Sequence, residues 1–413
     1  MKCGLIGEKL GHSFSKEIHQ KLGDYEYDLI ELAPDELEGF ILSGDFDGLN
    51  VTIPYKQAVM GYLDEISDLA REAGAVNTVV NKDGKLAGYN TDCGGMKMLI
   101  ERMGIDLKGK KAFIAGSGGT SRTAAAVCKS LGASEVVRAS RSGRNGAVTY
   151  EEAYRVCGDA ALLINTTPAG MYPDTDSMPF DISRFDRPEG VLDVVYNPLN
   201  TRLIQDARSK GIRAENGLYM LVGQAVLASS LFIGSEASES QDITERIYAD
   251  LLKEKRNIVL TGMPGSGKST LGKMLAEKLG REMVETDEII SKEAGTSIKE
   301  IFANHGEQHF RDLESEVIKR FSVKSGLVIS TGGGAILREE NISALRLNGV
   351  IVFIDRPLDQ LKATDSRPLS DDREKLERLY KERYEIYKNT ADIVVKTGGA
   401  KKDSAKKLWE TLK

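Results

Sequence analysis

The chain is poor in cysteine, with only four among its 413 residues and no C-x-x-C pair. Cysteines this few and this scattered predict no disulfide framework and suit a reducing compartment. Long hydrophobic runs are also missing. The longest, at 218–233, is interrupted by polar residues such as Gln224 and Ser229, and it predicts a core helix rather than a membrane span. The first residues lack the apolar stretch of a signal peptide, so we expect a cytoplasmic protein.

An excess of positive charge is absent as well. Lys and Arg number 56 against 62 Asp and Glu, which gives a net charge of -6. This balance disfavours a nucleic acid or a membrane surface as partner. The length predicts two to three domains, each large enough for its own core. No internal repeat occurs, and no Gly/Ser- or Pro-rich linker separates the domains.

A glycine-rich stretch at 262–270, G-M-P-G-S-G-K-S-T, lies between a short apolar run at 257–261 and a helical apolar pattern that starts at Leu271. Strand, loop and helix are the context of a P-loop, whose inward N–H groups and helix N-terminus hold phosphate. The lysine would reach the β- and γ-phosphates of ATP, and the serine after it would ligate Mg²⁺. The residues predicted to bind the nucleotide are Gly265, Ser266, Gly267, Lys268, Ser269 and Thr270, with Ser269 as the metal ligand.

A second glycine turn at 116–122, G-S-G-G-T-S-R, follows a strand pattern at 109–115 and opens a helix, as in a dinucleotide-binding unit. The next strand, 135–139, ends in S-R-S at 140–142, where an NAD-type site has an acidic residue. Arginine and hydroxyls suit a 2′-phosphate, so the pattern favours NADP over NAD. Further strand patterns at 162–165 and 190–195 predict a doubly wound parallel sheet.

Polar residues lie at the ends of the elements predicted before residue 105. Ser15 is predicted to cap a helix, and Ser13 with Ser15 could hold a small carboxylate, although capping alone also explains them. Thr52 and Lys56 follow a strand at 49–53, a common place for chemistry, although a loop lysine is usually just solvated. Asp92 would begin the helix at 96–103, where capping could again explain it. The other elements predicted here are a strand at 25–32, a helix at 34–42 and a strand at 73–80.

Up to about residue 252 these motifs resemble shikimate dehydrogenase, through S-x-S at 13–15, N-V-T-x-P-x-K at 50–56, A-G-A-V-N-T at 73–78, N-T-D at 90–92 and G-L-x-M-L-x-x-Q-A at 217–225. The resemblance implies that Lys56 and Asp92 are the catalytic pair for reduction of a ring ketone with NADPH. It implies substrate contacts by Ser13, Ser15, Thr52, Asn77, Tyr196 and Gln224. The cofactor residues expected are Gly116, Gly118, Gly119, Thr120, Ser121, Ser140, Arg141, Ser142, Arg144, Val194 and Gly217. The family usually has Asn-Arg-Thr where this chain has Ser-Arg-Ser.

From about residue 256 the chain resembles shikimate kinase, through the P-loop, E-T-D at 285–287, G-E-Q-H-F-R at 306–311, G-G-G at 332–334 and R-P-L at 367–369. The resemblance implies that Asp287 binds and orients the shikimate hydroxyls and that Arg311 and Arg383 hold its carboxylate. It also implies that backbone at Gly333 closes on the ring and that Arg367 is a lid arginine. Two departures are Glu285 in place of the family's first acid and Ala363 where an adenine-contacting arginine is common.

We therefore expect an α/β protein with a substrate domain at 1–105 plus 215–252, an NADP-binding Rossmann domain at 106–214 and a P-loop kinase domain at 253–413. The expected reactions reduce 3-dehydroshikimate to shikimate with NADPH and phosphorylate shikimate with ATP and Mg²⁺. The rivals are a quinate/shikimate dehydrogenase fused to another small-polyol kinase, and a non-catalytic sensor of NADP and ATP. Oligomeric state stays open. His305 and His309 share a helix face, but H-G-E-Q-H is not the zinc motif H-E-x-x-H.

Overall fold

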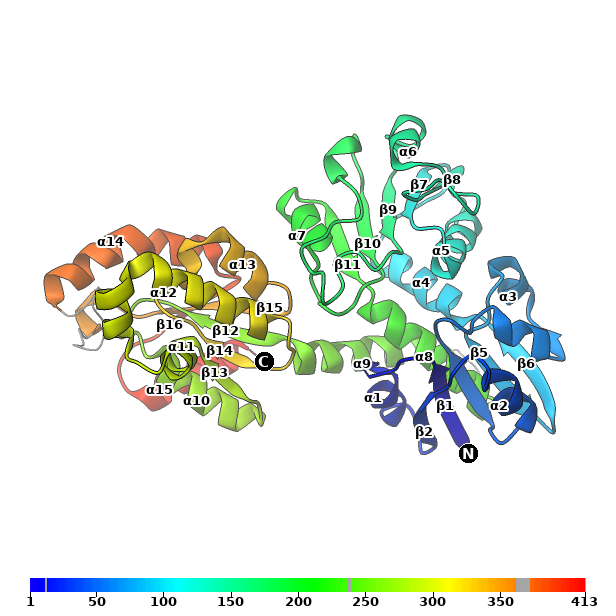
Figure 1. Ribbon diagram of the computed structural model, residues 1–413, viewed down its shortest axis with the longest axis horizontal. Coiled ribbons are helices and arrows are strands. Elements are labelled where there is room, and N and C mark those ends of the chain that lie inside the picture. The colour runs from blue at the N-terminus through cyan, green and yellow to red at the C-terminus, as the bar shows by residue number, and fades with distance from the viewer. Residues whose placement is uncertain (12, 236–238, 362–371, 413) are drawn as a thin grey trace. The chain divides into compact units, whose positions relative to one another are not determined.

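A computed structural model describes residues 1–11, 13–235, 239–361 and 372–412, and it has three β-sheets flanked by helices (Figure 1). The chain divides into two compact units. The first comprises Met1–Tyr196 and Thr201–Leu251, and the second comprises Asn197–Asn200 and Leu252–Lys413. The predicted α/β fold class is confirmed. All four cysteines are free and buried, and no described helix is both long and apolar enough to cross a membrane.

The first sheet is mixed, with six strands in the order β2-β1-β3-β5-β6-β4. Strands β2, β1 and β3 run parallel, whereas β5 is antiparallel to both β3 and β6. The strands are β1 (Lys2–Gly7), β2 (Glu26–Glu31), β3 (Gly48–Val51), β4 (Glu65–Ile66), β5 (Thr78–Lys82) and β6 (Lys85–Tyr89). The helices of this part are α1 (Ser15–Gln20), α2 (Leu37–Ser43), α3 (Asp68–Ala73) and the 3₁₀ turn η1 (Ala58–Tyr62).

The second sheet is parallel throughout, with the order β11-β10-β9-β7-β8. After β7 the chain moves outward to β8 and then returns to β9 on the other side of β7, so the loops at the carboxyl ends of β7 and β9 diverge into a crevice. The strands are β7 (Lys111–Ala115), β8 (Glu135–Ala139), β9 (Leu162–Asn165), β10 (Gly190–Asp193) and β11 (Arg213–Asn216). The helices are α5 (Gly119–Ser130), α6 (Tyr150–Val156), α7 (Arg202–Ser209) and the turn η2 (Ile182–Arg184).

Helices α4 (Thr91–Arg102) and α8 (Leu218–Ile233) pack closely because glycine lies at their crossing. A Cβ added to Gly95 would lie 2.5 Å from the carbonyl oxygen of Met220, and one added to Gly223 would lie 3.3 Å from the Cα of Gly95. Asp92 lies three residues before Gly95 and Gln224 directly follows Gly223, and both line one cavity. One residue, Arg256, lies between helix α9 (Ser240–Lys255) and strand β12 (Asn257–Thr261).

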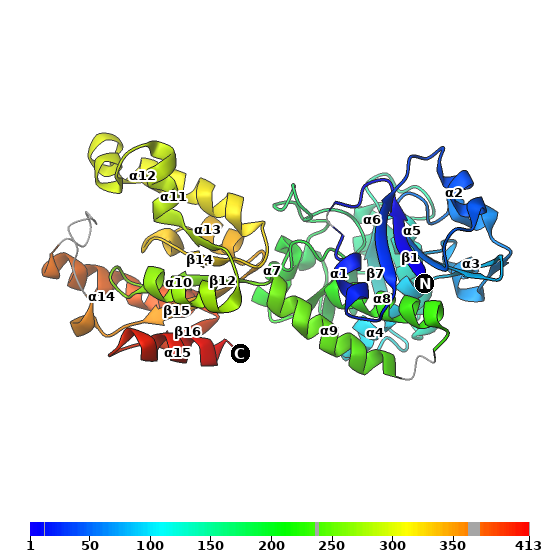
Figure 2. The ribbon, with the colours of Figure 1, turned by 90° about the horizontal axis from the view of Figure 1, so that it is seen from below.

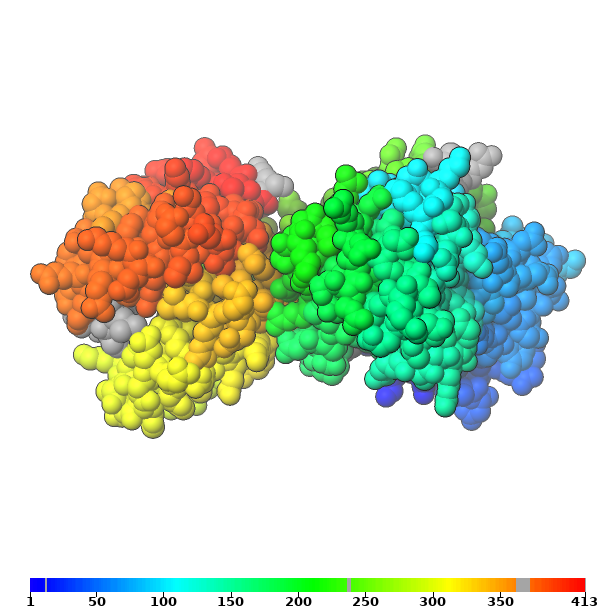
Figure 3. All heavy atoms as spheres, turned by 90° about the horizontal axis from the view of Figure 1, so that it is seen from above, coloured from blue at the N-terminus to red at the C-terminus, as the bar shows by residue number. Residues whose placement is uncertain are grey.

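The second unit is built on a parallel sheet in the order β13-β14-β12-β15-β16. Its strands are β12 (Asn257–Thr261), β13 (Met283–Glu285), β14 (Val328–Ser330), β15 (Gly349–Asp355) and β16 (Ile393–Lys396). Its helices are α10 (Lys268–Leu279), α11 (Thr286–Ala294), α12 (Ile298–Ser322), α13 (Glu339–Leu345), α14 (Arg373–Thr390) and α15 (Lys401–Thr411), with the turns η4 (Ala335–Leu337) and η5 (Leu358–Gln360). Within this unit, α11 and α12 rise to one side of the sheet in Figure 2, and the yellow segment containing α12 forms a lobe of its own in Figure 3.

Several predicted boundaries were wrong. Ser15 does not cap α1, because the N-cap is Phe14 in a helical conformation with no side-chain cap bond, so Ser15 is the first helical residue. The helix predicted from residue 34 begins at Leu37. The strand predicted at 73–80 begins at Thr78, because Ala73 still belongs to α3 and Gly74 ends that helix in the left-handed region.

Candidate active sites

The first candidate site is built around Lys56 and Asp92. The Lys56 Nζ donates a hydrogen bond to Asp92 Oδ2 at 2.5 Å, and their side chains are 24% and 15% exposed. Asp92 lies in the first turn of α4, whose N-cap Asn90 accepts a hydrogen bond from the backbone N–H of Cys93. The helix N-terminus therefore supports the carboxylate, and the carboxylate fixes the ammonium group while leaving it within reach of a ligand.

Buried polar side chains form a network behind this pair. Asn77 Nδ2 donates to the Thr91 hydroxyl at 3.0 Å and to Gln224 Oε1 at 3.4 Å, and the Thr91 backbone N–H donates to Asn77 Oδ1 at 2.7 Å. The hydroxyls of Thr78 and Thr91 are 3.0 Å apart. Because these bonds use the local donors and acceptors, the amides of Asn77 and Gln224 are held in fixed orientations.

A cavity of about 420 Å³ joins the pair to the network. All eight residues that we predicted to be catalytic or to contact the substrate in this unit line it: Ser13, Ser15, Thr52, Lys56, Asn77, Asp92, Tyr196 and Gln224. The hydroxyls of Ser13 and Ser15 are 3.0 Å apart, and Ser13 also accepts a bond from the backbone N–H of Ser15. Three residues expected at the cofactor, Thr120, Val194 and Gly217, line the same cavity from the second sheet.

A second cavity, of about 740 Å³, lies at the carboxyl ends of the second sheet. It is lined by five of the residues expected at the cofactor, Gly116, Gly118, Ser140, Arg141 and Ser142, together with Tyr150 and the segment 166–169. Met171 lines both this cavity and the smaller one, so the two adjoin. A ligand that extends from the second cavity past Met171 would therefore place one end in the smaller cavity, which Lys56 also lines.

The glycine turn fits a dinucleotide. Gly116 has φ +128, and a Cβ there would meet the Thr166 hydroxyl at 2.3 Å, whereas nothing lies within 4 Å of a Cβ placed on Gly118 or Gly119. That open space at the start of α5 lets a diphosphate approach backbone N–H groups. Ser121 has another role, since it is buried and its hydroxyl donates to the Gly118 carbonyl at 2.8 Å. Arg144 is exposed on the loop after β8 and does not line the cavity.

The second candidate site surrounds the P-loop. Gly262, Gly265 and Gly267 have φ values of +146, +78 and +95, in the left-handed region that glycine tolerates. Lys268 Nζ donates to the carbonyls of Gly262 and Met263 at 2.9 and 3.2 Å, so the ammonium group lies inside the loop. The hydroxyl of Ser266 is buried without a hydrogen-bond partner among the described residues, as expected where a phosphate would supply one.

The predicted metal ligand contacts an acid. The Ser269 hydroxyl donates to Glu285 Oε1, and Glu285 Oε2 is buried with no hydrogen-bond partner in the described part of the chain. Lys273 Nζ lies 3.9 Å from Glu285 Oε2. The glutamate that replaces the family's aspartate therefore reaches the serine hydroxyl. A hydroxyl beside a carboxylate is the oxygen-rich environment that Mg²⁺ and its bound waters require, so these residues fit the metal.

Asp287, Arg311 and Glu314 converge on the triple-glycine turn. A Cβ on Gly332 would lie 2.4 Å from Glu314 Oε1 and 2.7 Å from Asp287 Oδ1, and both oxygens are buried without a hydrogen-bond partner among the described residues. Arg311 donates to Glu314 Oε2 at 2.7 Å. Burial raises the pKa of Glu314 more than the neighbouring Arg311 lowers it, and Asp287 raises it further. Two unpartnered carboxylate oxygens facing one small turn suit a ligand with several hydroxyls.

Arg383 and Tyr387, both on α14, donate to the carbonyl of Gly333, the former at 3.2 Å. Gly333 also faces the P-loop, since a Cβ there would meet Pro264 at 3.2 Å. The turn thus links the two predicted substrate arginines to the nucleotide loop. Arg367 and Ala363 lie outside the described residues. The rings of His305 and His309 are 5.0 Å apart on α12, and the described residues contain no cluster of three metal-ligating side chains.

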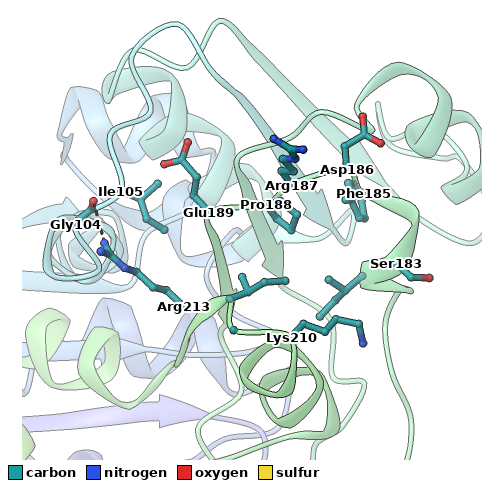
Figure 4. Close-up of a pocket in the computed structure, with 13 residues that line it drawn as sticks. Gly104, Ile105, Ser183, Phe185, Asp186, Arg187, Pro188, Glu189, Lys210 and Arg213 are labelled. Atoms are coloured by element: carbon teal, nitrogen blue, oxygen red, sulfur yellow. Dashed lines mark hydrogen bonds between the residues drawn. The ribbon is translucent and has the colours of Figure 1, made fainter.

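A third hollow, of about 770 Å³, lies at the opposite edge of the second sheet, where β10 and β11 begin. Figure 4 shows Arg213 reaching back to the carbonyl of Gly104, with Arg187 and Glu189 on the other side of the hollow. Glu189 is held by Lys110 at 2.7 Å. The two adjoining cavities lie at the carboxyl ends of the strands, whereas this hollow lies at their amino ends. The hollow therefore takes no part in the candidate active site.

Sequence reasoning missed several residues at these sites. Thr91 lies at the centre of the polar network, Tyr150 and Met171 line the cofactor cavity, and Glu314 pairs with Arg311. Thr91 could have been found inside the motif at 90–92, and Glu314 from its position three residues after Arg311 on a helix. Tyr150 and Met171 belong to no motif and reach the cavity only through the fold.

Comparisons with known proteins find matches for both parts of the chain. Residues 5–79 match the family of shikimate dehydrogenase substrate binding domains, and residues 264–413 match shikimate kinase. A shikimate dehydrogenase (NADP(+)) of Clostridium perfringens is 39% identical over 266 residues, covering 60% of this chain and 97% of the relative.

Two solved structures resemble the same part of the chain. One is a chorismate mutase/shikimate 5-dehydrogenase fusion protein from Clostridium acetobutylicum, with a TM-score of 0.57 and 33% identity over 60% of this chain and 96% of that one. The other is shikimate 5-dehydrogenase from Thermus thermophilus in complex with NADP(H) and shikimate, with a TM-score of 0.53 and 29% identity over 60% and 99%.

Proposed function

The chain belongs to the shikimate dehydrogenase family and carries a shikimate kinase domain after it, and from this we propose which residues perform each of its two reactions. The enzyme reduces 3-dehydroshikimate to shikimate with NADPH, and it then phosphorylates shikimate with ATP and Mg²⁺ to give shikimate 3-phosphate. The observation that carries the residue assignment is the Lys56–Asp92 contact in a cavity that adjoins the glycine-turn cavity.

In the reduction, NADPH supplies the hydride when bound. Lys56 gives a proton from Nζ to the ketone oxygen as that carbon becomes an alcohol carbon, and solvent returns a proton to the amine afterwards. Asp92 keeps the ammonium group aimed into the cavity. The hydroxyls of Ser13 and Ser15 bind the substrate carboxylate, and Thr52, Asn77, Tyr196 and Gln224 bind the ring hydroxyls and fix the face that reacts.

In the phosphorylation, Asp287 accepts a hydrogen bond from the attacking hydroxyl and takes its proton as the new P–O bond forms, while the bond from the γ-phosphorus to the bridging oxygen of ATP breaks and ADP leaves. Arg311 and Arg383 hold the carboxylate of shikimate, and the Gly333 backbone limits the position of the ring. Lys268 neutralises the transferring phosphate, while Ser269 would hold the metal with Glu285 behind it. The developing negative charge is therefore met by fixed cations within the second unit.

The direct test mixes the protein with 3-dehydroshikimate, NADPH and Mg-ATP, and follows NADPH oxidation together with the phosphorylated product. Oxidation followed by phosphorylation is the expected course. Parallel reactions with quinate, and with NAD⁺ in place of NADP⁺ in the reverse direction, measure substrate and cofactor selectivity. A protein that binds both nucleotides without turnover would instead be a sensor. We place this activity in the cytoplasm, where reduced cysteines and both nucleotides are available.

A further inference from the structure

The loop after β8 presents the two arginines expected at the 2′-phosphate of NADP. We call residues 140–147 the arginine loop. Arg141 lines the cofactor cavity, and both Arg141 and Arg144 are exposed. An exposed arginine carries a large side-chain entropy, so its value as a phosphate ligand depends on how firmly its backbone is held.

The base of the arginine loop is closed by a β-bridge between Ala139 and Val148. The Ser140 N–H donates to the Val148 carbonyl at 2.9 Å, and the Val148 N–H donates to the carbonyl of Arg138 at 2.8 Å. Between these bonds the chain turns sharply, with Gly143, Asn145 and Gly146 at φ values of 60, 59 and 72. A turn with so many left-handed residues needs further support from outside the loop.

Arg138 provides that support from the strand. Its Nη2 donates to the carbonyl of Asn145 at 3.1 Å and to that of Gly146 at 3.3 Å, the two residues directly after Arg144. A Cβ on Gly146 would lie 2.9 Å from the same nitrogen, so glycine allows the close approach. Arg138 Nη1 and the hydroxyl of Ser140 are buried and have no hydrogen-bond partner among the described residues.

These contacts set Arg138 apart from the arginines that would touch the cofactor. Arg138 lies on β8, and Ser140 follows the last residue of that strand. Ser140 lines the cofactor cavity, whereas Arg138 does not, so Arg138 acts on the loop and not on the nucleotide itself. The planar guanidinium can hold two adjacent carbonyls at once, which a lysine ammonium cannot match in geometry.

We propose that Arg138 is a positioning residue for NADP selectivity, which holds the arginine loop so that Arg141 meets the 2′-phosphate. The proposal rests on the assignment of Arg141 to that phosphate. Replacing Arg138 weakens binding of a 2′-phosphorylated nucleotide and leaves binding of its unphosphorylated counterpart largely intact. The loss of two hydrogen bonds to the loop corresponds to a roughly five- to 150-fold loss of affinity.

The test measures binding of 2′,5′-ADP and of 5′-AMP to the full-length protein by calorimetry. Arg138→Met is expected to lose affinity for 2′,5′-ADP only, and Arg138→Lys to lie between it and the unaltered protein. Arg155→Met is the matched control, because Arg155 is exposed on α6 in the same domain and its loss removes one positive charge without touching the arginine loop. Equal losses for both nucleotides, or no loss for either, would overturn the proposal.

A second measurement needs no nucleotide. Trypsin cleavage at the Arg144–Asn145 bond, followed by mass spectrometry of the native protein, is expected to be faster in Arg138→Met than in Arg155→Met. Unchanged cleavage would contradict the support given to the loop. The variant Arg141→Ala tests the assignment of Arg141 to the 2′-phosphate. If Arg141→Ala still prefers 2′,5′-ADP to 5′-AMP, that assignment is wrong. If Arg141→Ala loses this preference but the Arg138 variants keep it, the assignment stands and only the role of Arg138 is wrong.

Discussion

The Lys56 ammonium group lies 2.5 Å from Oδ2 of Asp92, so the candidate proton donor of the dehydrogenase is held by a carboxylate at the start of a helix. The two residues come from different elements, one from the turn after β3 and the other from α4. Helix α4 also packs on α8 through a glycine crossing, which brings Gln224 to the same cavity. The candidate site therefore combines a loop residue, the start of α4 and a residue of α8.

Lys56→Ala is predicted to lower dehydrogenase turnover by roughly 10²–10⁴-fold, the usual contribution of a positioned acid–base group. The measurement is NADPH oxidation with 3-dehydroshikimate. Shikimate phosphorylation by the same variant is the internal control and should stay near its normal rate, because Lys268 and Asp287 belong to the other unit. A variant that still oxidises NADPH at a near-normal rate would remove Lys56 from the mechanism.

The sequence predicted those parts of the fold that are encoded locally. The strand at 162–165 and the helix at 218–233 have the predicted bounds, because continuous apolar runs with clear ends define them. The cap at Ser15 failed because capping depends on the backbone conformation of Phe14, which is already helical. From the sequence alone, a serine at the start of a helix can be predicted either as the N-cap or as the first helical residue.

The same distinction holds for the sites. Motif residues such as Lys56 and Asp92 could be predicted because their spacing is fixed within short segments. Thr91 lies inside the motif at 90–92, but its place in the network does not follow from the motif, because its partner Gln224 is 133 residues away and arrives only when α8 packs on α4. The support of the arginine loop by Arg138 could not be predicted from the sequence either, because it consists of hydrogen bonds to backbone carbonyls, which every residue has.

Asp287→Asn is predicted to lower shikimate kinase turnover by roughly 10²-fold or more, since the amide cannot take the proton of the attacking hydroxyl. Glu288→Gln is the matched control, because Glu288 is the next residue on α11 and its side chain forms an ion pair with an exposed lysine, Lys273, at 3.4 Å. Phosphorylation of added shikimate is measured in both variants, with NADPH oxidation as the check on folding. Equal rates in the two variants would count against Asp287 as the base.

Arg141→Asp is predicted to move the cofactor preference of the dehydrogenase from NADP toward NAD. A carboxylate at this position repels the 2′-phosphate and can accept a hydrogen bond from a 2′-hydroxyl. The ratio of kcat/KM for NADP⁺ and NAD⁺ in shikimate oxidation is the measurement. If the ratio does not change, another group on the arginine loop reads the phosphate, and Arg144 is the first to test.

Asp193 gives a pH-dependent contribution to stability. It is fully buried and accepts bonds from Asn165 Nδ2 at 2.9 Å, the Val195 N–H at 3.0 Å and the Thr201 hydroxyl at 2.6 Å, none of them a titratable group. Burial raises its pKa from 3.8 to about 6, and the three hydrogen bonds offset this only in part. The folded state therefore holds this proton more tightly than the unfolded state does, and the extra stability, present below pH 3.8, is lost as pH rises through about 6.

Asp193→Asn removes this titration while keeping a similar shape. The stability of the unaltered protein relative to the variant is predicted to fall by up to about 3 kcal/mol between about pH 4 and pH 7, from roughly 1.4 kcal/mol per pKa unit. Hydrogen exchange of peptides covering β9 and β10, compared between the two proteins at each pH, measures the difference. The fluorescence of Trp409, the only tryptophan, reports unfolding of the second unit and should show no such difference. A stability difference that does not vary with pH would mean that Asp193 stays ionised throughout this range.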